Sequence, residues 1–472
     1  KISSNGKTIG YITGGQFTYK STVKYIEEMA DYDLFATAIA TMNDNSKSLG
    51  AIKVAEGVMA TATRVKDGEE PAISNHTYEK VTVLEETAVI YFTVNQSNVR
   101  YSQKSSDEIK RLKEFAKLGY ETKVYVNFKK DRNLDIHKNE SFKCFPMYGR
   151  NWHEFHKWYS MYYMWKILRK NPDAIFIATT WGMAKPFSFL KKKYPLSKMI
   201  VVAHGLEVTR LKQGAELNAF KKVVNSSNLI LCVSKFTKKE IIERVKNIET
   251  KHIRFLPNGV DINRFFPVKT TPDFLTNYGI PEKSKIILTL ARIIRRKGHD
   301  TVIKSLPNLI KEFPDIRYVI AGPHRKKDPY LFELKKLAKE LLIEDHVIFI
   351  DYIPEKDLNE IYSRSKIYIM VSRTYHDIGD SEGFGITFLE ANACGCPVIG
   401  SNEGGIPDAV NHGENGLLVP ADDIKSLSSS ITKLLNNESY RKEIIKKGID
   451  RVNAGFTWKK LTGRMIDMLE KN

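Results

Sequence analysis

The stretch Lys285–Ala321, KIILTLARIIRRKGHDTVIKSLPNLIKEFPDIRYVIA, decides the expected fold. Its first six residues, Lys285–Leu290, form a short apolar run that predicts a buried strand. A basic loop follows, and Asp300–Phe313 then has the apolar spacing of an amphipathic helix. Arg317–Ala321 is a second apolar run. A strand, a helix and a strand in this order predict a unit of parallel sheet covered by a helix.

The same alternation extends along most of the chain. It predicts an α/β fold with two Rossmann-like lobes, joined by a linker at Asn263–Leu275 that contains Pro267 and Pro272. Two further helices are expected at Ser105–Lys117 and Tyr330–Leu342. The remaining predicted strands are Thr87–Thr93, Thr122–Phe128, Asp173–Thr179, Met199–Ala203, Asn228–Ser234, Ile253–Pro257, Val347–Ile350, Lys366–Val371 and Pro397–Gly400.

The residues before the first lobe have a different pattern, with short Ala-, Thr- and Val-rich segments. We therefore predict a small β-rich accessory domain over residues 1–85, which could build an oligomer or bind an acceptor. The predicted lobes are residues 86–267 and 268–455, and residues 456–472 are expected to pack back on the first lobe. An earlier nucleotide-type turn at Thr13-Gly14-Gly15 is the less favoured alternative, because the strand–helix alternation is cleaner after residue 87.

Composition excludes several classes of protein. Of the 472 residues, 42% are hydrophobic and 27% are charged, which is typical of globular proteins and excludes a disordered chain. Four cysteines are too few for a disulfide scaffold, and no apolar run reaches the roughly 18 residues of a membrane helix. Lys1–Gly10 lacks the apolar core of a signal peptide, so we expect a cytoplasmic protein.

The net charge is +19, and the whole excess of basic residues lies within residues 101–300. Such an excess fits a nucleic acid, an anionic membrane or an anionic substrate, and it also fits simple solubility. We find no nucleic-acid recognition module in the sequence, so we predict no nucleic-acid partner.

The motif richest in chemistry is Ser381–Ala391, SEGFGITFLEA, which follows a predicted strand and opens an apolar helix. Gly383 and Gly385 let a ligand approach the backbone closely, and the first-turn amides of a helix suit a phosphate. If helical, the eight steps from Glu382 to Glu390 would span about 12 Å, too far for both carboxylates to act on one bond. That spacing suits a ligand with a sugar at each end and phosphate between. The alternative is that both acids only decorate a helix N-terminus, where acids are favoured.

Basic residues follow the strand Lys285–Leu290. Arg292 and Lys297 lie on a strand-to-helix loop, where separated cations can clamp a diphosphate. Ligands of open parallel sheets bind beyond the carboxyl ends of the strands, which is where both motifs are expected. We interpret Arg295 and Arg296 as solvated surface residues.

These motifs occur in an order that resembles one known family. The order is Asn258-Gly-Val-Asp261, Arg292 to Gly298, Glu382 to Ala391, Gly395-Cys-Pro-Val-Ile, Gly404-Gly-Ile-Pro407 and Gly413 to Val419. Together they resemble the retaining glycosyltransferases of family 4, which have the two-lobed GT-B fold and use nucleotide sugars. The resemblance covers about residues 87–472, is dense in the second lobe and sparse in the first, and leaves out residues 1–85.

The resemblance implies a role for each matching position. Arg292 and Lys297 would hold the donor diphosphate, and Glu382 would hold the transferred sugar. His204 would lie beside that sugar, although a structural strand-end histidine is the alternative, and Ser234 would face the cleft. Glu390 would bind the ribose, and the remaining donor-binding positions would be Gly383, Phe384, Gly385, Ile386 and Thr387. His204, Arg292, Lys297 and Glu382 are thus the candidate catalytic residues.

Three places depart from the family pattern, and one of them is Pro323-His324-Arg325, which stands where a small turn is usual. The glycine-rich loop expected after the first strand reads Asn95 to Arg100, so Asn98 and Arg100 become candidate contacts for acceptor or phosphate. Asp351 stands where a glycine is usual, which leaves the base-binding edge open. Cys394 and Cys396 could suggest a redox or metal pair, but we interpret them as the small-residue core of a turn, because two thiols do not complete a zinc site.

The predicted reaction transfers a sugar from a nucleotide diphosphate sugar, such as a UDP sugar, to an acceptor hydroxyl with retention. We expect no metal and no cofactor, because no D-x-D carboxylate pair accompanies the Glu382 loop. Alternatives are a soluble glucan or disaccharide synthase or phosphorylase of this fold, or a non-catalytic glycan-binding protein. A glycoside hydrolase is disfavoured, because its two carboxyls must lie roughly 5–9.5 Å apart.

The acceptor is expected on the basic first lobe. Within Arg150–Lys170, seven aromatic residues interleave with basic ones, and Lys191–Lys193 follow. Aromatic and basic residues together suit a helix on an anionic membrane, so we predict a lipid-linked or anionic cell-surface glycan as acceptor, in polysaccharide or glycolipid biosynthesis. Peripheral attachment to the inner membrane face would follow. The alternative, a core helix packed on the sheet, stays open at this point.

Overall fold

The computed structural model describes residues 2–4, 7–10, 39–41, 48–51, 90–94, 114, 115, 117, 122–128, 143–148 and 156–471, except 247, 270, 272 and 324–327. The chain divides into two compact units, residues 1–89 with 115–121 and residues 90–114 with 122–472. In the first unit the described strands form two antiparallel pairs, β1 (Ile2–Ser4) with β2 (Lys7–Gly10) and β3 (Ile39–Thr41) with β4 (Ser48–Ala51). The rest of the predicted accessory domain lies outside the described residues, and its boundary at residue 85 stays a prediction.

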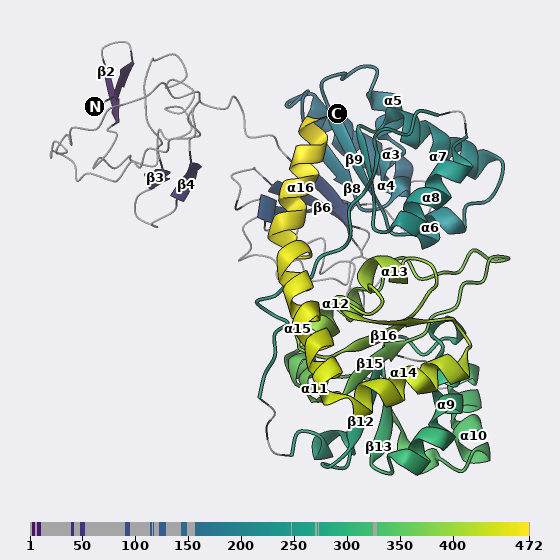
Figure 1. Cartoon of the computed structure of the whole chain (residues 1–472). Coiled ribbons are helices and arrows are strands. Elements are labelled where there is room, and N and C mark those ends of the chain that lie inside the picture. The colour runs from purple at the N-terminus through teal and green to yellow at the C-terminus, as the bar shows by residue number, and fades with distance from the viewer. Residues whose placement is uncertain are drawn as a thin grey trace. The chain divides into compact units, whose positions relative to one another are not determined.

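The second unit contains two parallel sheets, each covered by helices (Figure 1). In the first lobe the chain starts the sheet at β5, extends it through β6 and β7 on one side, and then adds β8 to β11 on the other side, as in a doubly wound fold. The strand order is β11 (Ile253–Phe255), β10 (Leu229–Cys232), β9 (Lys198–Ala203), β8 (Ile175–Ala178), β5 (Ile90–Val94), β6 (Thr122–Phe128) and β7 (Lys143–Tyr148).

Helix α7 of the first lobe buries one apolar stripe and packs against α4 and α5. In α7, Phe220, Val223 and Val224 are buried at a spacing of three and four residues, which places them on one helix face. Ser234 caps α8 by accepting a hydrogen bond from the Thr237 amide at 3.0 Å. The described helices are α3 (His156–Leu168), α4 (Trp181–Ala184), α5 (Phe187–Leu190), α6 (Leu206–Thr209), α7 (Ala215–Ser226) and α8 (Lys235–Arg244).

The second lobe has a six-stranded parallel sheet with the Rossmann order of strands. That order places the loops after β12 and β15 side by side at the carboxyl end of the sheet, because these two strands are direct neighbours. The strands are β14 (Val347–Ile350), β13 (Ile316–Ala321), β12 (Lys285–Leu290), β15 (Ile367–Met370), β16 (Val398–Ser401) and β17 (Gly416–Val419).

Helices cover both faces of this sheet. On one face α9 packs against α10 and α14, and on the other α12 packs against α11 and α15. The bounds are η3 (Thr276–Tyr278), η4 (Arg295–Lys297), α9 (His299–Glu312), α10 (Pro329–Glu340), η5 (Glu344–His346), η6 (Glu355–Asp357), α11 (Leu358–Arg364), α12 (Ile386–Ala393), α13 (Ile406–Ala409), α14 (Ile424–Asn436), α15 (Glu438–Gly455) and α16 (Trp458–Glu470).

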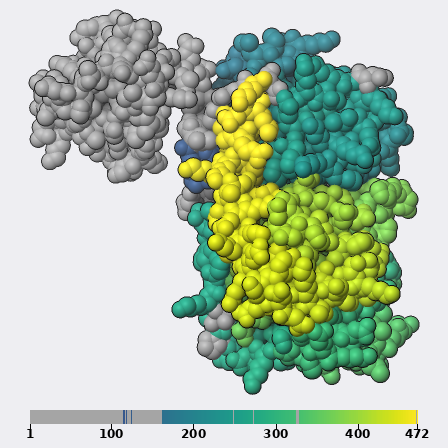
Figure 2. Space-filling model, in the orientation of Figure 1, coloured from purple at the N-terminus to yellow at the C-terminus, as the bar shows by residue number. Residues whose placement is uncertain are grey.

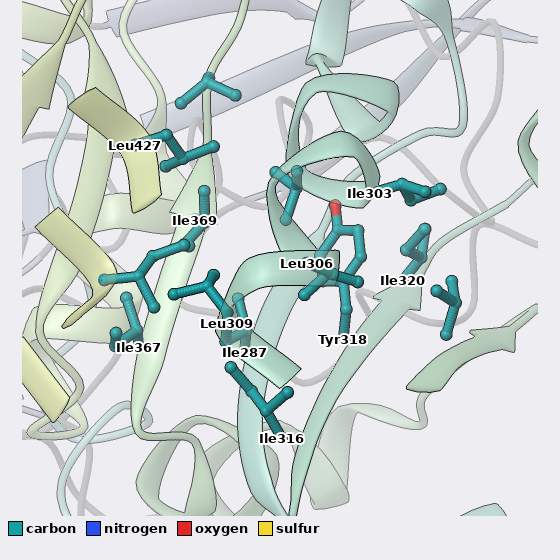
Figure 3. Close-up of a cluster of buried hydrophobic side chains, with 14 of the residues drawn as sticks. Ile287, Ile303, Leu306, Leu309, Ile316, Tyr318, Ile320, Ile367, Ile369 and Leu427 are labelled. Atoms are coloured by element: carbon teal, nitrogen blue, oxygen red, sulfur yellow. The ribbon is translucent and has the colours of Figure 1, made fainter. Parts of the chain in front are cut away.

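The core of this lobe lies between α9 and the sheet. Figure 3 shows Ile303, Leu306 and Leu309 of α9 directed at Tyr318 and Ile287 of the strands. All five are 2% exposed or less, so about 1.5–3 kcal/mol per side chain favours folding here. This packing fixes where β12 ends and therefore where its loop begins.

Two chain crossings connect the lobes. On its way from the first lobe to the second, the chain passes Val260, whose amide donates to the Phe456 carbonyl at 2.8 Å. Val260 also forms a β-bridge with Thr457, where the chain returns to the first lobe. The predicted linker is held by the second lobe, since Asn359 donates to the Arg264 carbonyl at 2.6 Å. The C-terminal helices α14 to α16 are exposed at the surface (yellow in Figure 2).

The structure confirms the predicted fold class of two Rossmann-like α/β lobes. Predicted strands β6, β12 and β14 have the expected bounds, and most of the others shift by one to three residues. The sequence reading missed β7, Lys143–Tyr148, which contains Pro146 and is an edge strand of the sheet. The predicted helix Ser105–Lys117 lies mostly outside the described residues.

We predict that Gly298→Ala destabilises the second lobe. Gly298 has φ of +73°, and a Cβ there would lie 2.2 Å from the Val371 carbonyl oxygen. The backbone strain and the clash should together cost at least about 2 kcal/mol. Thermal unfolding should show a melting temperature lowered by about 5 °C or more. Gly463→Ala is the matched control, because nothing lies within 4 Å of its Cβ position in α16, and it should be neutral or stabilising. Equal melting temperatures for the two variants would contradict this account.

Candidate active site

The loop after β12 carries four basic residues, three of them on a short 3-10 turn. Arg292 is exposed two residues after the strand, and η4 then presents Arg296 and Lys297 at the carboxyl end of the sheet. Gly298 ends the turn in a left-handed conformation and starts α9. The loop therefore leaves a buried strand, turns tightly and returns to a buried helix, which fixes its position.

The neighbouring loop runs from the end of β15 to the N-terminus of α12. Gly385 precedes α12 with φ of +91°, and a Cβ there would lie 2.7 Å from the Phe388 ring. The helix opens at Ile386 and Thr387, whose first-turn amides have no carbonyl partner within the helix. The positive end of the helix dipole thus faces the same edge of the sheet as Lys297.

Glu382 lies between these loops and pairs with two cations. Its Oε2 accepts a hydrogen bond from Arg296 Nη1 at 2.6 Å, and Lys297 Nζ donates to the same oxygen. Lys297 Nζ also lies 3.2 Å from Met370 Sδ. Burial alone would raise the pKa of Glu382, but Lys297 and Arg296 outweigh it and lower the pKa to about 2. Glu382 is therefore a carboxylate at every pH that a cell reaches.

Arg296 overturns one sequence prediction. We interpreted it as a solvated residue, and that is wrong: its side chain is only 4% exposed and its Nε lies 3.1 Å from Asp380 Oδ1. A guanidinium this buried needs carboxylate partners, and Asp380 and Glu382 supply them. Arg295 does behave as predicted, because it is 60% exposed and pairs with Glu333 on the surface.

Two residues outside the motifs hold the basic loop in place. The Arg373 amide donates to the Arg296 carbonyl at 2.8 Å, and Arg373 Nη1 donates to the Arg295 carbonyl at 2.8 Å. Arg373 is itself fixed by Asp300, whose pKa falls to about 2 as the ion pair and hydrogen bonds outweigh its burial. His299 Nε2 lies 3.1 Å from the Arg292 carbonyl, which can only accept, so this nitrogen carries the proton.

Glu390 occupies a different environment from Glu382. Its side chain lies on α12, is only 4% exposed, and accepts a hydrogen bond from the Tyr362 hydroxyl at 3.0 Å. Tyr368 similarly donates to Thr387 Oγ1 at 2.6 Å. The two acids of the motif therefore lie on different elements of the site: Glu382 is paired with cations in the loop, and Glu390 with a tyrosine beneath the helix.

The first lobe contributes backbone contacts at the same place. A Cβ at Gly383 would lie 2.0 Å from the His204 carbonyl oxygen, and a Cβ at Gly405 would lie 2.8 Å from Ser234 Cβ. The His204 amide donates to the Glu207 carboxylate, which fixes the loop after β9. A side chain at either position would clash, so Gly383 and Gly405 allow the lobes to meet.

The structure thus brings His204, Lys297, Glu382, Gly383 and the start of α12 together. Phe384 is buried and stacks on Phe456 with ring centroids 6.3 Å apart, so its side chain belongs to the core rather than to a ligand surface. Asn98 and Arg100 lie outside the described residues.

The cysteine pair has a structural environment. Cys394 and Cys396 are free, buried thiols, and burial raises the pKa of both. This fits the predicted small-residue core of a turn. Within the described ranges no cluster of three or more His, Cys, Asp or Glu residues could hold a metal ion.

The arrangement suits an anion with a polar group at one end. Lys297, the exposed Arg292 and the dipole of α12 can stabilise negative charge that develops on a diphosphate. A carboxylate in a nearly dry site, such as Glu382, is a strong acceptor for hydroxyl groups. A sugar diphosphate combines both features.

Two family models match consecutive parts of the chain. The model described as "Glycosyltransferase Family 4" matches residues 112–264, and the model described as "Glycosyl transferases group 1" matches residues 271–451. A relative from Corynebacterium glutamicum, a GDP-mannose-dependent monoacylated α-(1-6)-phosphatidylinositol monomannoside mannosyltransferase, is 30% identical over 302 residues, which cover 62% of this chain and 76% of the relative. The chain belongs to glycosyltransferase family 4. It therefore transfers a sugar from a nucleotide sugar to an acceptor.

Other comparisons agree with this assignment. The GDP-mannose-dependent α-(1-6)-phosphatidylinositol monomannoside mannosyltransferase of Mycolicibacterium smegmatis is 28% identical over 301 residues, which cover 62% of this chain and 76% of the relative. A glycosyltransferase structure from Rickettsia africae superposes with a TM-score of 0.68 at 21% identity, covering 82% of this chain and 98% of that one. The superposition supports the predicted GT-B fold.

Arg296 and Arg295 make a matched pair of test positions, since they are neighbours in sequence with opposite burial. We expect Arg296→Ala to lower donor binding at least about tenfold, because Glu382 would lose a partner and Asp380 would stay buried beside the gap. Arg295→Ala should change it less than about twofold, as exposed ion pairs contribute little. Isothermal titration with a nucleotide sugar measures both, and equal losses would rule out a specific role for Arg296.

The buried His299 should make the stability of the protein depend on pH. Burial lowers its pKa to about 4 from the ordinary value near 6.5, although the Arg292 carbonyl opposes the shift. The unfolded chain therefore binds a proton that the folded protein excludes between pH 6.5 and 4. The contribution of the neutral His299 to the free energy of unfolding should be fully present above pH 6.5 and should fall by about 3 kcal/mol towards pH 4.

Melting temperature measured against pH checks the His299 prediction. The nearby charged groups Lys297, Asp300 and Arg373 act on this pKa, and the Asp300 pKa of about 2 keeps that carboxylate ionised in the folded protein throughout this window. His299→Gln keeps a donor for the Arg292 carbonyl without the titration, so its melting temperature should depend less on pH in this range. An unchanged slope in this variant would assign the loss to other groups.

Proposed function

We propose that this glycosyltransferase transfers a hexosyl group with retention of anomeric configuration and without a metal ion. Glu382 binds hydroxyls of the transferred sugar, Arg292 and Lys297 bind the diphosphate, and Glu390 binds the ribose. His204 lies against the sugar from the first lobe. The observation that supports this proposal most strongly is the pairing of Glu382 with two buried cations beside the N-terminus of α12.

In the proposed reaction the bond from the sugar to the diphosphate breaks, and a bond to the acceptor oxygen forms. The acceptor hydroxyl loses its proton, which the departing diphosphate can take. Stabilising the negative charge on the leaving group is then the main catalytic task. Lys297 and Arg292 supply positive charge that compensates this negative charge, so the proposed reaction does not require a divalent cation.

We propose a mannosyl donor, GDP-mannose, and a lipid-linked acceptor with an anionic headgroup. The mannosyltransferases from Corynebacterium glutamicum and Mycolicibacterium smegmatis support this choice, because their names specify GDP-mannose and a phosphatidylinositol mannoside. The basic excess of residues 101–300 supports an anionic acceptor on the first lobe.

A surface of the first lobe supports attachment to a membrane. Helices α3 and α5 are in contact, and between them they expose Tyr162 at 52% and Phe189 at 65%. Leu196 is 68% exposed in the following loop, and Lys192 and Lys193 are exposed beside it. Large apolar side chains among lysines suit the interface of an anionic bilayer. Within the described residues no helix is long and apolar enough to cross a membrane.

The aromatic helix α3 has one buried face and one exposed face. The inward face of α3 is core, since Met164, Ile167 and Leu168 are buried. The outward face carries Tyr162 and also Trp165, over whose ring Arg169 lies at 5.0 Å. The core alternative holds for the inward face of α3, and contact of the exposed outward face with a membrane stays a proposal.

The donor prediction is tested with a panel of UDP, GDP and ADP sugars. We expect one base to bind, with GDP-mannose the tightest, and Glu390→Ala to weaken it at least about tenfold through loss of a charged hydrogen bond. Isothermal titration gives the affinities, and addition of EDTA should leave them unchanged. NMR of the product then reports the anomeric configuration. Failure of every nucleotide sugar to bind the folded protein would refute the proposed function, and an inverted product would refute retention.

The membrane prediction is tested by sedimentation with vesicles. We expect binding to phosphatidylglycerol-containing vesicles at low salt and none to phosphatidylcholine alone. Lys192→Ala combined with Lys193→Ala should weaken binding about thirtyfold, at about 1 kcal/mol for each lysine near the surface. Phe332→Ser, at a side chain 67% exposed on the second lobe, is the matched control and should have no effect. Equal binding to both kinds of vesicle would contradict membrane attachment through this surface.

A further inference from the structure

The two lobes touch at two polar contacts close to Glu382. In the first, Thr209 Oγ1 donates to the Gly379 carbonyl at 2.6 Å, and Arg210 Nη2 lies 3.1 Å from Asp380 Oδ1. In the second, the Lys235 amide at the start of α8 donates to Asp408 Oδ2 at 2.6 Å. The first contact joins the end of α6 to the loop after β15, and the second joins the start of α8 to α13.

The first contact is built on a tight hairpin. The Tyr375 amide donates to the Asp380 carbonyl at 2.8 Å, and the Asp380 amide donates to the Tyr375 carbonyl at 3.0 Å. Gly379 has φ of +60°, and a Cβ there would lie 2.4 Å from the Thr209 carbonyl oxygen. The hairpin therefore fits the first lobe at backbone distance, and it holds Asp380 in one position.

Asp380 takes part both in the contact between the lobes and in the donor site. The Oδ1 atom that lies 3.1 Å from Arg210 is also 3.1 Å from Nε of Arg296. On the other side of the guanidinium, Arg296 Nη1 donates a hydrogen bond to Glu382. Charges thus alternate from Arg210 on the first lobe, through Asp380 and Arg296, to the carboxylate of Glu382.

We propose that Asp380 is a positioning residue that couples the contact between the lobes to the orientation of Glu382. A planar guanidinium held at both edges has a fixed direction, whereas one held at a single edge can rotate. Asp380 lies 3.1 Å from the Nε edge of Arg296 and restrains it through charge rather than through a hydrogen bond, and Arg210 restrains Asp380 in the same way when the lobes meet. The Glu382 carboxylate then points in the direction that the sugar requires only when this contact is formed.

Burial decides how strongly each link acts. Arg296 is 4% exposed and Asp380 is 17% exposed, so their ion pair is shielded from water and salt. Arg210 is 51% exposed, so its link is weaker and is screened. Loss of Asp380 should therefore have the larger effect, and loss of Arg210 a smaller effect of the same kind.

This inference rests on the proposed role of Glu382 at the sugar, and the experiment separates the two. The measured quantity is the ratio of the Kd for GDP to the Kd for GDP-mannose, or for the matching pair of the donor that the panel selects. GDP lacks the sugar, so the ratio reports the contact with the sugar alone. Glu382→Gln should reduce the ratio to near one. If it does not, the proposed function is wrong at this residue, whatever the other variants do.

The coupling is tested by four further variants. Asp380→Ala should lower the ratio about tenfold, and Arg210→Ala about threefold, as expected for a partly exposed ion pair. The double variant should be no worse than Asp380→Ala, because both residues act through one chain of contacts. Asp408→Ala is the matched control: it removes the second lobe contact, which does not include Glu382, and should leave the ratio within about twofold.

Three results would overturn the coupling while leaving the proposed function intact. They are an unchanged ratio in Asp380→Ala, additive losses in the double variant, and a loss in Asp408→Ala equal to that in Arg210→Ala. If Asp380→Ala does not fold, Arg210→Ala decides alone, since Arg210 is half exposed and its replacement spares the core. A changed ratio in that variant supports the coupling, and an unchanged ratio rejects it.

Discussion

The site depends on one ion pair, between the carboxylate of Glu382 and the cations of Arg296 and Lys297. All three side chains are between 4% and 15% exposed, so each charge has lost most of its water. Such charges are tolerated only together, because removing one partner leaves the others buried and unpaired. The loops after β12 and β15 must therefore lie at hydrogen-bonding distance, and the adjacency of these strands in the Rossmann order places them there.

The same constraint explains the residues around the pair. Arg373 and His299 hold the carbonyl groups of the basic loop and keep Arg292, Arg296 and Lys297 on one side of the sheet. The glycines of the Glu382 loop leave room for the first lobe, whose His204 carbonyl takes the space of a side chain at Gly383. The arrangement of these groups, which we propose bind a sugar and a diphosphate, thus follows from the need of buried charges to be paired.

Much of this could be predicted from the sequence, because local patterns determine it. Apolar runs such as Lys285–Leu290 predicted most of the strands, and the spacing of Glu382 and Glu390 indicated a ligand with two polar ends. The predictions that failed concern side chains whose partners are distant in the sequence. Nothing near Arg296 reveals that Asp380, 84 positions later, turns it inward, and a short run of basic residues normally faces solvent. Arg373 and His299 were missed for the same reason, as their partners are backbone carbonyls that no motif encodes.

The most direct measurement is a crystal structure of the protein with an unreacted nucleotide sugar bound. The account predicts a hydroxyl of the transferred sugar within hydrogen-bonding distance of Glu382, and the diphosphate between Lys297, Arg292 and the first turn of α12. Arg296 should stay on Glu382 while Lys297 turns towards phosphate. A donor whose diphosphate lies elsewhere, or whose sugar leaves the Glu382 carboxylate paired only with its two cations, would contradict it.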